Sequence, residues 1–170
     1  DGAAFRLAGA LHACEGADLS SNFFWAPVSV LRHADGREER FPHLVTDRAR
    51  PGVIAVNQKA ERFVNESNSY HHFASAMQSQ PENAPCFLIC DALAMKRYGL
   101  GLARPAPVNN DALIEAGYLH KADSLARLAQ QLGLDAQALA GTVARYNRDA
   151  AQGEDPQFAK GGNSYNRAMG

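Results

Sequence analysis

Two helices that carry their own end signals most constrain the fold of this chain. Apolar residues recur at helical spacing over 125–132, where Asp123 can cap the first turn and Gly133 can end the last. Asp135 can cap a second, longer helix that ends before Gly153. Because the link between the two patterns is so short, we expect them to form a helical hairpin that packs on a sheet.

Short runs rich in β-branched and aromatic residues alternate with helical patterns along the rest of the chain. Asp35-Gly36 separates two such runs and is typical of a β-hairpin turn, and 57–61 is expected to be a second turn although it lacks glycine. The expected strands are 28–32, 37–41, 53–57, 62–65 and 87–90, and the other expected helices are 3–14, 73–77 and 92–98, the last capped by Asp91. This mixture predicts an α+β fold with a small mixed or antiparallel sheet and packed helices.

Length and composition fit one compact domain and exclude several functions. The chain has 170 residues and a formal net charge of -1 with the signs mixed, so it can bury a core but offers no charged surface for nucleic acid. Its apolar runs fall far short of the roughly 20 residues that span a bilayer. Cys86 and Cys90 are expected to be buried free thiols, because a zinc site needs four ligands. We therefore expect a cytoplasmic protein without a metal site.

The apolar periodicity ends near Asp155. The stretch 161–164 is Gly-Gly-Asn-Ser, and we expect the tail from Asp155 onward to be loose. No G-x-G-x-x-G follows an expected strand. The turn that cradles the phosphates of a dinucleotide is therefore not encoded in this chain.

The run Arg62-Phe63-Val64-Asn65-Glu66-Ser67-Asn68-Ser69-Tyr70 resembles the R-F-x-N-E signature of the flavoprotein family that includes fumarate reductases, succinate dehydrogenases and 3-ketosteroid dehydrogenases. The runs 41–57, 85–91 and 144–147 are similar to further landmarks of that family. Asn65 and Glu66 are expected to fix the geometry of the loop through backbone groups.

The resemblance implies a capping domain whose FAD domain lies outside this chain. Residues 1–17 would be a helix leading in from that FAD domain, 18–154 the capping or substrate domain, and 155–170 a connector back to it. FAD would be bound mainly by the absent parts. Asp1, which with Gly2 resembles the end of the family's T-G-D-G loop, is the one flavin contact expected here.

The same resemblance implies a proton-handling site. The fourth residue after the signature Glu handles the substrate proton in this family; it is Arg in fumarate reductases and Tyr in ketosteroid dehydrogenases, and here it is Tyr70, just beyond an expected strand. The run 46–50 resembles the T-E-x-x-R relay, with Asp47 in place of Glu. Arg50 would then favour the phenolate of Tyr70. Tyr70 could instead be a packing residue, and Asp47 and Arg50 an ordinary surface pair worth under ~1 kcal/mol.

Aromatic residues suggest where a flat apolar substrate would lie. Phe24 and Trp25 precede Pro27 and could line a pocket, although core packing is the simpler interpretation. Thr46 is the third expected substrate contact. Ala26 stands where fumarate reductases have a carboxylate-binding His, which weakens a dicarboxylate substrate.

These features favour the cap of an FAD-dependent dehydrogenase that desaturates a 3-ketosteroid or similar cyclic ketone. Tyr70 would handle the proton and the flavin the hydride. The expected partners are a small apolar ketone and the FAD domain of the same parent chain, and the isolated chain is expected to be inactive. Two alternatives remain open: the cap of a fumarate- or urocanate-type alkene reductase, and a non-catalytic binding module.

Overall fold

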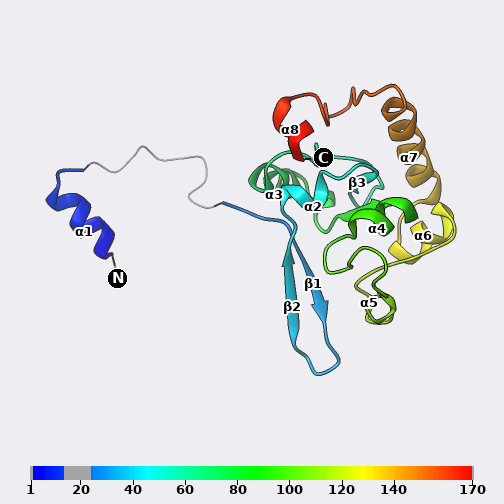
Figure 1. The fold of residues 1–170 in the computed structure, drawn as a ribbon, viewed down its shortest axis with the longest axis horizontal. Coiled ribbons are helices and arrows are strands. Elements are labelled where there is room, and N and C mark those ends of the chain that lie inside the picture. Colours follow the sequence, from blue (N-terminus) through cyan, green and yellow to red (C-terminus); the bar gives the residue numbers. More distant parts are fainter. Residues whose placement is uncertain (1, 14–23, 170) are drawn as a thin grey trace.

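A computed structural model describes residues 2–13 and 24–169 of the chain. Figure 1 shows its helices and strands coloured along the sequence. In chain order they are α1 (Ala3–Ala10), β1 (Val28–Arg32), β2 (Glu38–Pro42), α2 (Val45–Arg48), β3 (Val53–Val56), α3 (Tyr70–Ser79), the 3-10 helix η1 (Pro81–Asn83), β4 (Phe87–Cys90), α4 (Ala92–Tyr98), α5 (Asp111–Glu115), α6 (Leu125–Leu132), α7 (Ala136–Ala150) and α8 (Ser164–Met169).

The described strands form two small antiparallel sheets, as the α+β prediction expects. β1 pairs with β2 around the predicted turn, where Arg37 donates its N–H to Asp35 Oδ1 at 3.0 Å and Gly36 has a φ of 83°. This hairpin projects from the rest of the molecule (Figure 1). β3 pairs with β4, with Val53 opposite Cys90 and Val56 opposite Phe87. Every residue of β3 is buried, so β3 lies inside the core.

The two faces of β3 pack against different helices. Ile54 and Val56 belong to a core cluster that contains Ala129 of α6 and Leu139 of α7. Ala55 lies in a second cluster, which holds Phe73 of α3. Successive side chains of a strand point to opposite faces, so this short strand joins the α6–α7 hairpin to α3.

The predicted helical hairpin is confirmed, with one shift at its start. Ser124 caps α6, because its Oγ accepts from Arg127 N at 3.3 Å. Asp123, the predicted cap, instead pairs with the Arg127 side chain at 3.1 Å. Gly133 ends α6 in the left-handed conformation and Asp135 caps α7 as predicted. α7 ends at Ala150.

The predicted strand over 62–65 is wrong. Only an isolated bridge joins Arg62 to Val56. The turn before it is confirmed: Asn57 Oδ1 accepts the N–H groups of Lys59 and Glu61 at 3.0 Å each, and Ala60 takes the left-handed φ of 60° that a glycine would favour. The chain then folds back instead of extending, because the buried Arg62 side chain pairs with a residue four positions later.

The prediction of a loose tail after Asp155 is also wrong. Asp155 is bound by a buried arginine, and Asn166 in α8 is 2 % exposed. Polar side chains dock this segment, so a search for apolar periodicity does not detect it. Its role as a connector to another domain stays a prediction.

The first helix is shorter than predicted, since α1 ends at Ala10, and the expected stop at 15–16 lies outside the described residues. None of its residues is buried, and Phe5, Leu7 and Leu11 are 69 %, 69 % and 81 % exposed. In the described part of the chain, no helix combines the length and apolarity needed to cross a bilayer.

Candidate active site

The signature segment is anchored by a buried ion pair between Arg62 and Glu66. Arg62 Nε donates to Glu66 Oε1 at 2.9 Å, and Nη2 donates to Oε2 at 2.8 Å. Glu66 is fully buried and Arg62 is 4 % exposed. Glu66 Oε1 also accepts from the backbone N–H of Ala55 at 3.0 Å. The pair therefore ties the signature to the central strand β3.

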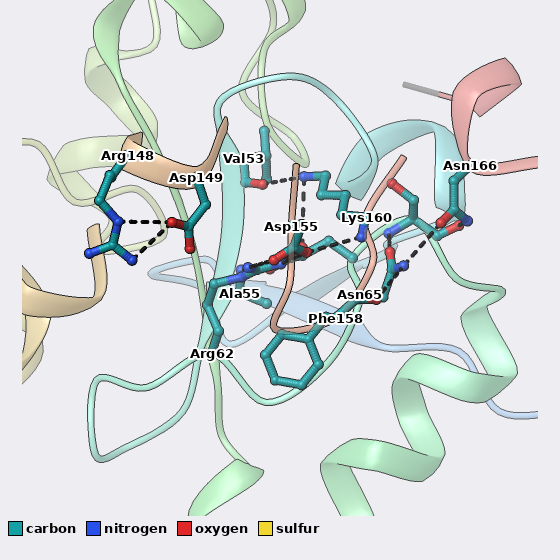
Figure 2. A network of polar contacts seen from close by, with 12 residues as sticks. Val53, Ala55, Arg62, Asn65, Arg148, Asp149, Asp155, Phe158, Lys160 and Asn166 are labelled. Carbon is teal, nitrogen blue, oxygen red and sulfur yellow. Dashed lines mark hydrogen bonds and ion pairs between the residues drawn. The ribbon is translucent and has the colours of Figure 1, made fainter. Parts of the chain in front are cut away.

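Two residues of the C-terminal tail complete this ionic cluster (Figure 2). Arg62 donates to Asp155 at 2.8 and 2.9 Å, and Lys160 Nζ donates to the Val53 carbonyl at 2.6 Å and lies 3.7 Å from Glu66 Oε2. Burial acts to lower the pKa of Arg62, but its bonds to Asp155 and Glu66 outweigh burial and raise it. Burial acts to raise the pKa of Asp155, and the bonds from Arg62 hold it below its usual value.

Arg48 holds the backbone of the signature loop from the side of α2. Its side chain is fully buried, and it donates to the carbonyl of Glu66 at 2.6 Å and to that of Asn68 at 3.1 Å. Its guanidinium carbon lies 4.4 Å from the centre of the Phe73 ring. Burial lowers the pKa of Arg48 to about 10, against the opposing effect of Asp47 and Glu66. Arg48 therefore fixes two carbonyls just before Tyr70.

Asn65 and Asn166 bond two further backbone groups of the loop, the N–H and the carbonyl of Ser67. Asn65 Oδ1 accepts from Ser67 N at 2.8 Å, and Asn65 Nδ2 donates to Asn166 Oδ1 at 3.0 Å. Asn166 Nδ2 donates to the Ser67 carbonyl at 3.1 Å. Figure 2 shows the two asparagines facing each other between the loop and α8. The expectation that Asn65 and Glu66 fix the loop through backbone groups is confirmed.

Tyr70 is the first residue of α3 and not the neighbour of a strand. Ser69 caps this helix, since its Oγ accepts from His72 N at 3.3 Å. The Tyr70 side chain is 37 % exposed. A rigid loop thus ends in a tyrosine that is open on one side. This combination suits a residue that meets a ligand from outside the chain.

Phe24 and Trp25 lie beside the first turn of α3. Trp25 donates its backbone N–H to His71 Nδ1 at 3.2 Å, and the Phe24 ring meets the His71 ring edge-on at 5.5 Å. Phe24 is 84 % exposed and Trp25 43 %. The structure therefore brings two of the three predicted substrate contacts to the helix turn that carries Tyr70, with open aromatic surfaces.

The predicted relay residues Asp47 and Arg50 have other partners. Asp47 bonds to His43 Nδ1 and accepts from Gly101 N at 3.0 Å. The guanidinium of Arg50 lies 5.3 Å from the centre of the Tyr98 ring. Within residues 2–13 and 24–169, no ion pair joins Asp47 to Arg50.

The remaining predicted contacts are Thr46 and Asp1. Thr46 is exposed on α2, and no hydrogen bond joins it to Tyr70 in the described ranges. Asp1 lies outside the described residues. Their proposed roles stay predictions.

Sequence reasoning missed the residues that hold the signature loop. These are Arg48, Asp155, Lys160 and Asn166. Arg48 stands two positions before Arg50, and nothing in the spacing separates a buried arginine from an exposed one. The contact between His43 and Asp47 was also missed. Their four-residue spacing is the one sequence feature that could have indicated it.

The described residues do not provide a phosphate site for a dinucleotide. Gly99 and Gly101 form the only G-x-G of the sequence. The dinucleotide motif lies between the end of a strand and the start of a helix. Gly99 instead lies at the end of helix α4. Both sheets of the described residues are antiparallel, whereas the dinucleotide motif belongs to a parallel βαβ unit. The described residues therefore offer no cradle for the pyrophosphate of FAD.

Comparison with known proteins shows consistent relatives. A family model described as FAD binding domain matches residues 1–170. The chain is 41 % identical over 155 residues to 4-oxocyclohex-2-ene-1-carboxylate 5-dehydrogenase of Sinomonas cyclohexanicum, covering 89 % of the chain and 26 % of the relative. It is 32 % identical over 161 residues to 3-oxosteroid 1-dehydrogenase of Mycolicibacterium smegmatis, covering 90 % and 27 %.

A solved structure agrees with the sequence relatives. The crystal structure of 3-ketosteroid delta1-dehydrogenase from Sterolibacterium denitrificans superimposes with a TM-score of 0.71 at 31 % identity, over 99 % of this chain and 30 % of that one. The chain thus spans about a quarter of the length of the curated relatives it matches. It belongs to the FAD-binding flavoprotein family that contains the 3-ketosteroid and cyclohexenecarboxylate dehydrogenases, and FAD is its cofactor.

Proposed function

We propose that this chain is the capping part of an FAD-dependent dehydrogenase that desaturates a cyclic ketone, either a 3-ketosteroid or a smaller ring. The two relatives support this class, because each is a dehydrogenase of a ring that bears an oxo group. The reaction would remove a proton next to the ketone and a hydride from the adjacent carbon. The cofactor would take the hydride, and this chain would handle the proton.

The observation that carries the proposal is the support given to Tyr70. The carbonyls of Glu66, Ser67 and Asn68 each accept a side-chain hydrogen bond from Arg48 or Asn166. Tyr70 follows two positions after Asn68 and keeps more than a third of its surface open. A proton-transferring group must be held within hydrogen-bond reach of its substrate. This loop can supply that precision.

The aromatic surface beside Tyr70 fits the proposed substrate. Phe24 and Trp25 expose their rings next to α3, and such surfaces suit a flat apolar ring. Thr46 would add a hydrogen bond from α2. In this proposal Arg50 would favour the phenolate form of Tyr70, and Asp47 would act on Arg50 only after exchanging its present partner His43.

An alkene reductase is the weaker alternative. A dicarboxylate needs cations for charge pairing, and this chain has Tyr70 and Ala26 where fumarate reductases have Arg and His. A non-catalytic binding module is the third possibility. It predicts that the Tyr70 hydroxyl is dispensable.

The decisive experiment uses the full-length flavoprotein. The protein is mixed without oxygen with a 3-ketosteroid or with 4-oxocyclohex-2-ene-1-carboxylate, and loss of the oxidised flavin absorbance is followed. Tyr70→Phe keeps the ring but removes the hydroxyl, so the rate of flavin reduction should fall by about 100-fold or more. Substrate affinity should change much less, because the lost interaction belongs mainly to the transition state.

Tyr165→Phe is the matched control, since Tyr165 is a similarly exposed tyrosine in α8, at 45 %. It should reduce flavin at the normal rate. Normal flavin reduction by Tyr70→Phe would remove the catalytic assignment and leave Tyr70 as a wall of the site. Reduction by neither ketone, together with oxidation of reduced flavin by fumarate, would favour the reductase.

A further inference from the structure

Four side chains, none of them Tyr70, form a continuous hydrogen-bonded array. Tyr118 Oη and Ser29 Oγ lie 2.6 Å apart, and Ser29 Oγ lies 2.8 Å from His43 Nε2. His43 Nδ1 bonds in turn to Asp47 Oδ2. His43 is 8 % exposed. The array draws together β1, the start of α2 and the segment after α5.

The loop after α4 closes both ends of the array. Gly101 N donates to Asp47 Oδ1 at 3.0 Å, and Leu102 N donates to Tyr118 Oη at 3.1 Å. A Cβ on Gly101 would lie 2.4 Å from Tyr118 Oη and 3.0 Å from His43 Cε1, and Gly101 has a φ of +59°. Only glycine allows the loop to approach this closely.

These contacts fix the direction of every hydrogen bond. Asp47, as a carboxylate, can only accept, so His43 carries its proton on Nδ1 and Nε2 is an acceptor. Ser29 must then donate to His43 Nε2 and accept from the Tyr118 hydroxyl. The Leu102 N–H completes the chain at Tyr118 Oη. When His43 is neutral, the Tyr118 hydroxyl therefore donates its proton to Ser29 Oγ and cannot donate it to a ligand.

Protonation of His43 reverses this direction. The imidazolium donates from Nε2 to Ser29 Oγ, which releases the Ser29 proton from His43 and allows Ser29 to donate to Tyr118 Oη. In that arrangement Tyr118 Oη accepts from both Ser29 and Leu102 N, and its own proton is free for an outside acceptor. The groups that face His43 are Asp47, Arg48, which donates to its carbonyl at 3.0 Å, and the Phe41 ring at 5.1 Å.

The array forms one wall of a cavity of about 680 Å³, and Tyr70 is not among the residues that line it. Ser29, His43 and Tyr118 all reach its surface. Most of the other walls are apolar and include Ile89, Met95, Leu100, Ile114, Leu128 and Leu132.

Cations gather at the same cavity. Lys96, Arg104 and Lys121 line it, and within the described ranges none of them forms an ion pair. The acidic residues that line it are Asp91, which caps α4 at 2.7 Å through Ala94 N, and Asp111. An apolar space with a hydroxyl donor and unpaired cations suits an organic anion.

We propose that this cavity binds a small carboxylate with an apolar body, and that Tyr118 donates its proton to the carboxylate when His43 is protonated. Tyr70 does not line this cavity, although Arg48, which holds the signature loop, does. Ligand binding would be coupled to protonation of His43 through Ser29. The Tyr118 proton is free for the ligand only when Ser29 donates to Tyr118 Oη.

The test titrates the isotope-labelled chain with benzoate and, separately, with benzyl alcohol as its neutral analogue. NMR signals of the Tyr118 ring and the His43 ring nitrogens are followed at about pH 5.5 and about pH 8. Benzoate should shift the Tyr118 signals and bind about tenfold more tightly at the lower pH, as expected for one added hydrogen bond to a charged acceptor. Benzyl alcohol should bind more weakly and without this pH dependence.

Variants separate the array from other causes of pH dependence. Ser29→Ala cuts the link, so benzoate should bind with similar affinity at both pH values. Persistent pH dependence in Ser29→Ala would assign it to another group, such as the cavity-lining His120, and overturn the coupling.

Tyr118→Phe should lose about tenfold in benzoate affinity at the lower pH, whereas the control Tyr165→Phe should lose none. Dispersed amide spectra verify that each variant is folded. Equal binding of benzoate and benzyl alcohol, or no benzoate-dependent change at Tyr118, would exclude the carboxylate site.

Discussion

Arg62 and Asp155 form a doubly hydrogen-bonded ion pair, at 2.8 and 2.9 Å, between residues 93 positions apart in the sequence. Their side chains are 1 % and 6 % exposed. The same arginine binds Glu66 of the signature. The C-terminal tail is therefore part of the scaffold that holds the loop before Tyr70.

Replacing Asp155 with Asn should lower the free energy of unfolding by roughly 3 kcal/mol, because removing one partner of a buried pair leaves the other charge poorly compensated. Glu66 still pairs with Arg62, so the loss should lie at the lower end of the usual range. Urea unfolding followed by circular dichroism measures it. Asp123→Asn breaks an exposed pair, with side chains 71 % and 70 % exposed, and should cost under ~1 kcal/mol. Equal losses of unfolding free energy in the two variants would show that the buried pair stabilises the chain no more than the exposed pair does.

The stabilisation by Asp155 should depend on pH in a predictable direction. Its pKa in the folded chain is lowered, with burial opposed by the bonds from Arg62, so its contribution is present above the unfolded pKa of about 3.9 and lost as pH falls through the folded value. The stability difference between the wild type and Asp155→Asn should be constant above about pH 5 and shrink below about pH 4. Urea titrations across this range test the sign, and a difference that grows on acidification contradicts it.

The tail should resist proteolysis in the native chain. Trypsin can cut after Lys160, but that side chain is 9 % exposed and bound to the Val53 carbonyl. Arg37 follows the exposed turn of the β1–β2 hairpin and should be cut first. Mass spectrometry of a time course distinguishes the two sites. Cleavage at Lys160 should accelerate in Asp155→Asn, and early cleavage there in the wild type would contradict the docked tail.

The two described cysteines should react slowly. Burial raises the pKa of Cys86 and of Cys90 to about 11, so only about one thiol in a thousand is a thiolate at about pH 8. In a Cys14→Ser background, a chromogenic disulfide reagent should react at least about 100-fold more slowly than with a small free thiol. Urea should restore the normal rate. Fast reaction of the folded chain would show that the thiols are accessible.

The chain by itself should bind FAD weakly, with a dissociation constant of about a millimolar or higher, because among residues 2–13 and 24–169 no helix N-terminus with a glycine-rich turn is present to bind the pyrophosphate. Quenching of flavin fluorescence measures this. A purified chain that is yellow and carries one FAD per chain would contradict this prediction. It would show that the chain binds FAD without a glycine-rich phosphate site.

Local signals predicted much of the fold. The turn at Asp35-Gly36, the caps Asp91 and Asp135 and the stop at Gly133 all act within a few residues of their own position. The signature segment likewise identified the family. These features can be predicted from sequence because each depends on one φ angle or on a hydrogen bond between residues two or three positions apart.

Only the tertiary structure decided how the signature is held. Arg48 and Arg50 differ by two positions, yet one is buried against the loop and the other lies over Tyr98. Asp155 and Asn166 reach the signature from the tail, and Ser29, His43 and Tyr118 meet from three separate segments. Charged and polar residues are typical of surfaces, so their type does not reveal a buried partner far along the chain. Such a partner becomes visible only when the packed core brings both side chains out of water together.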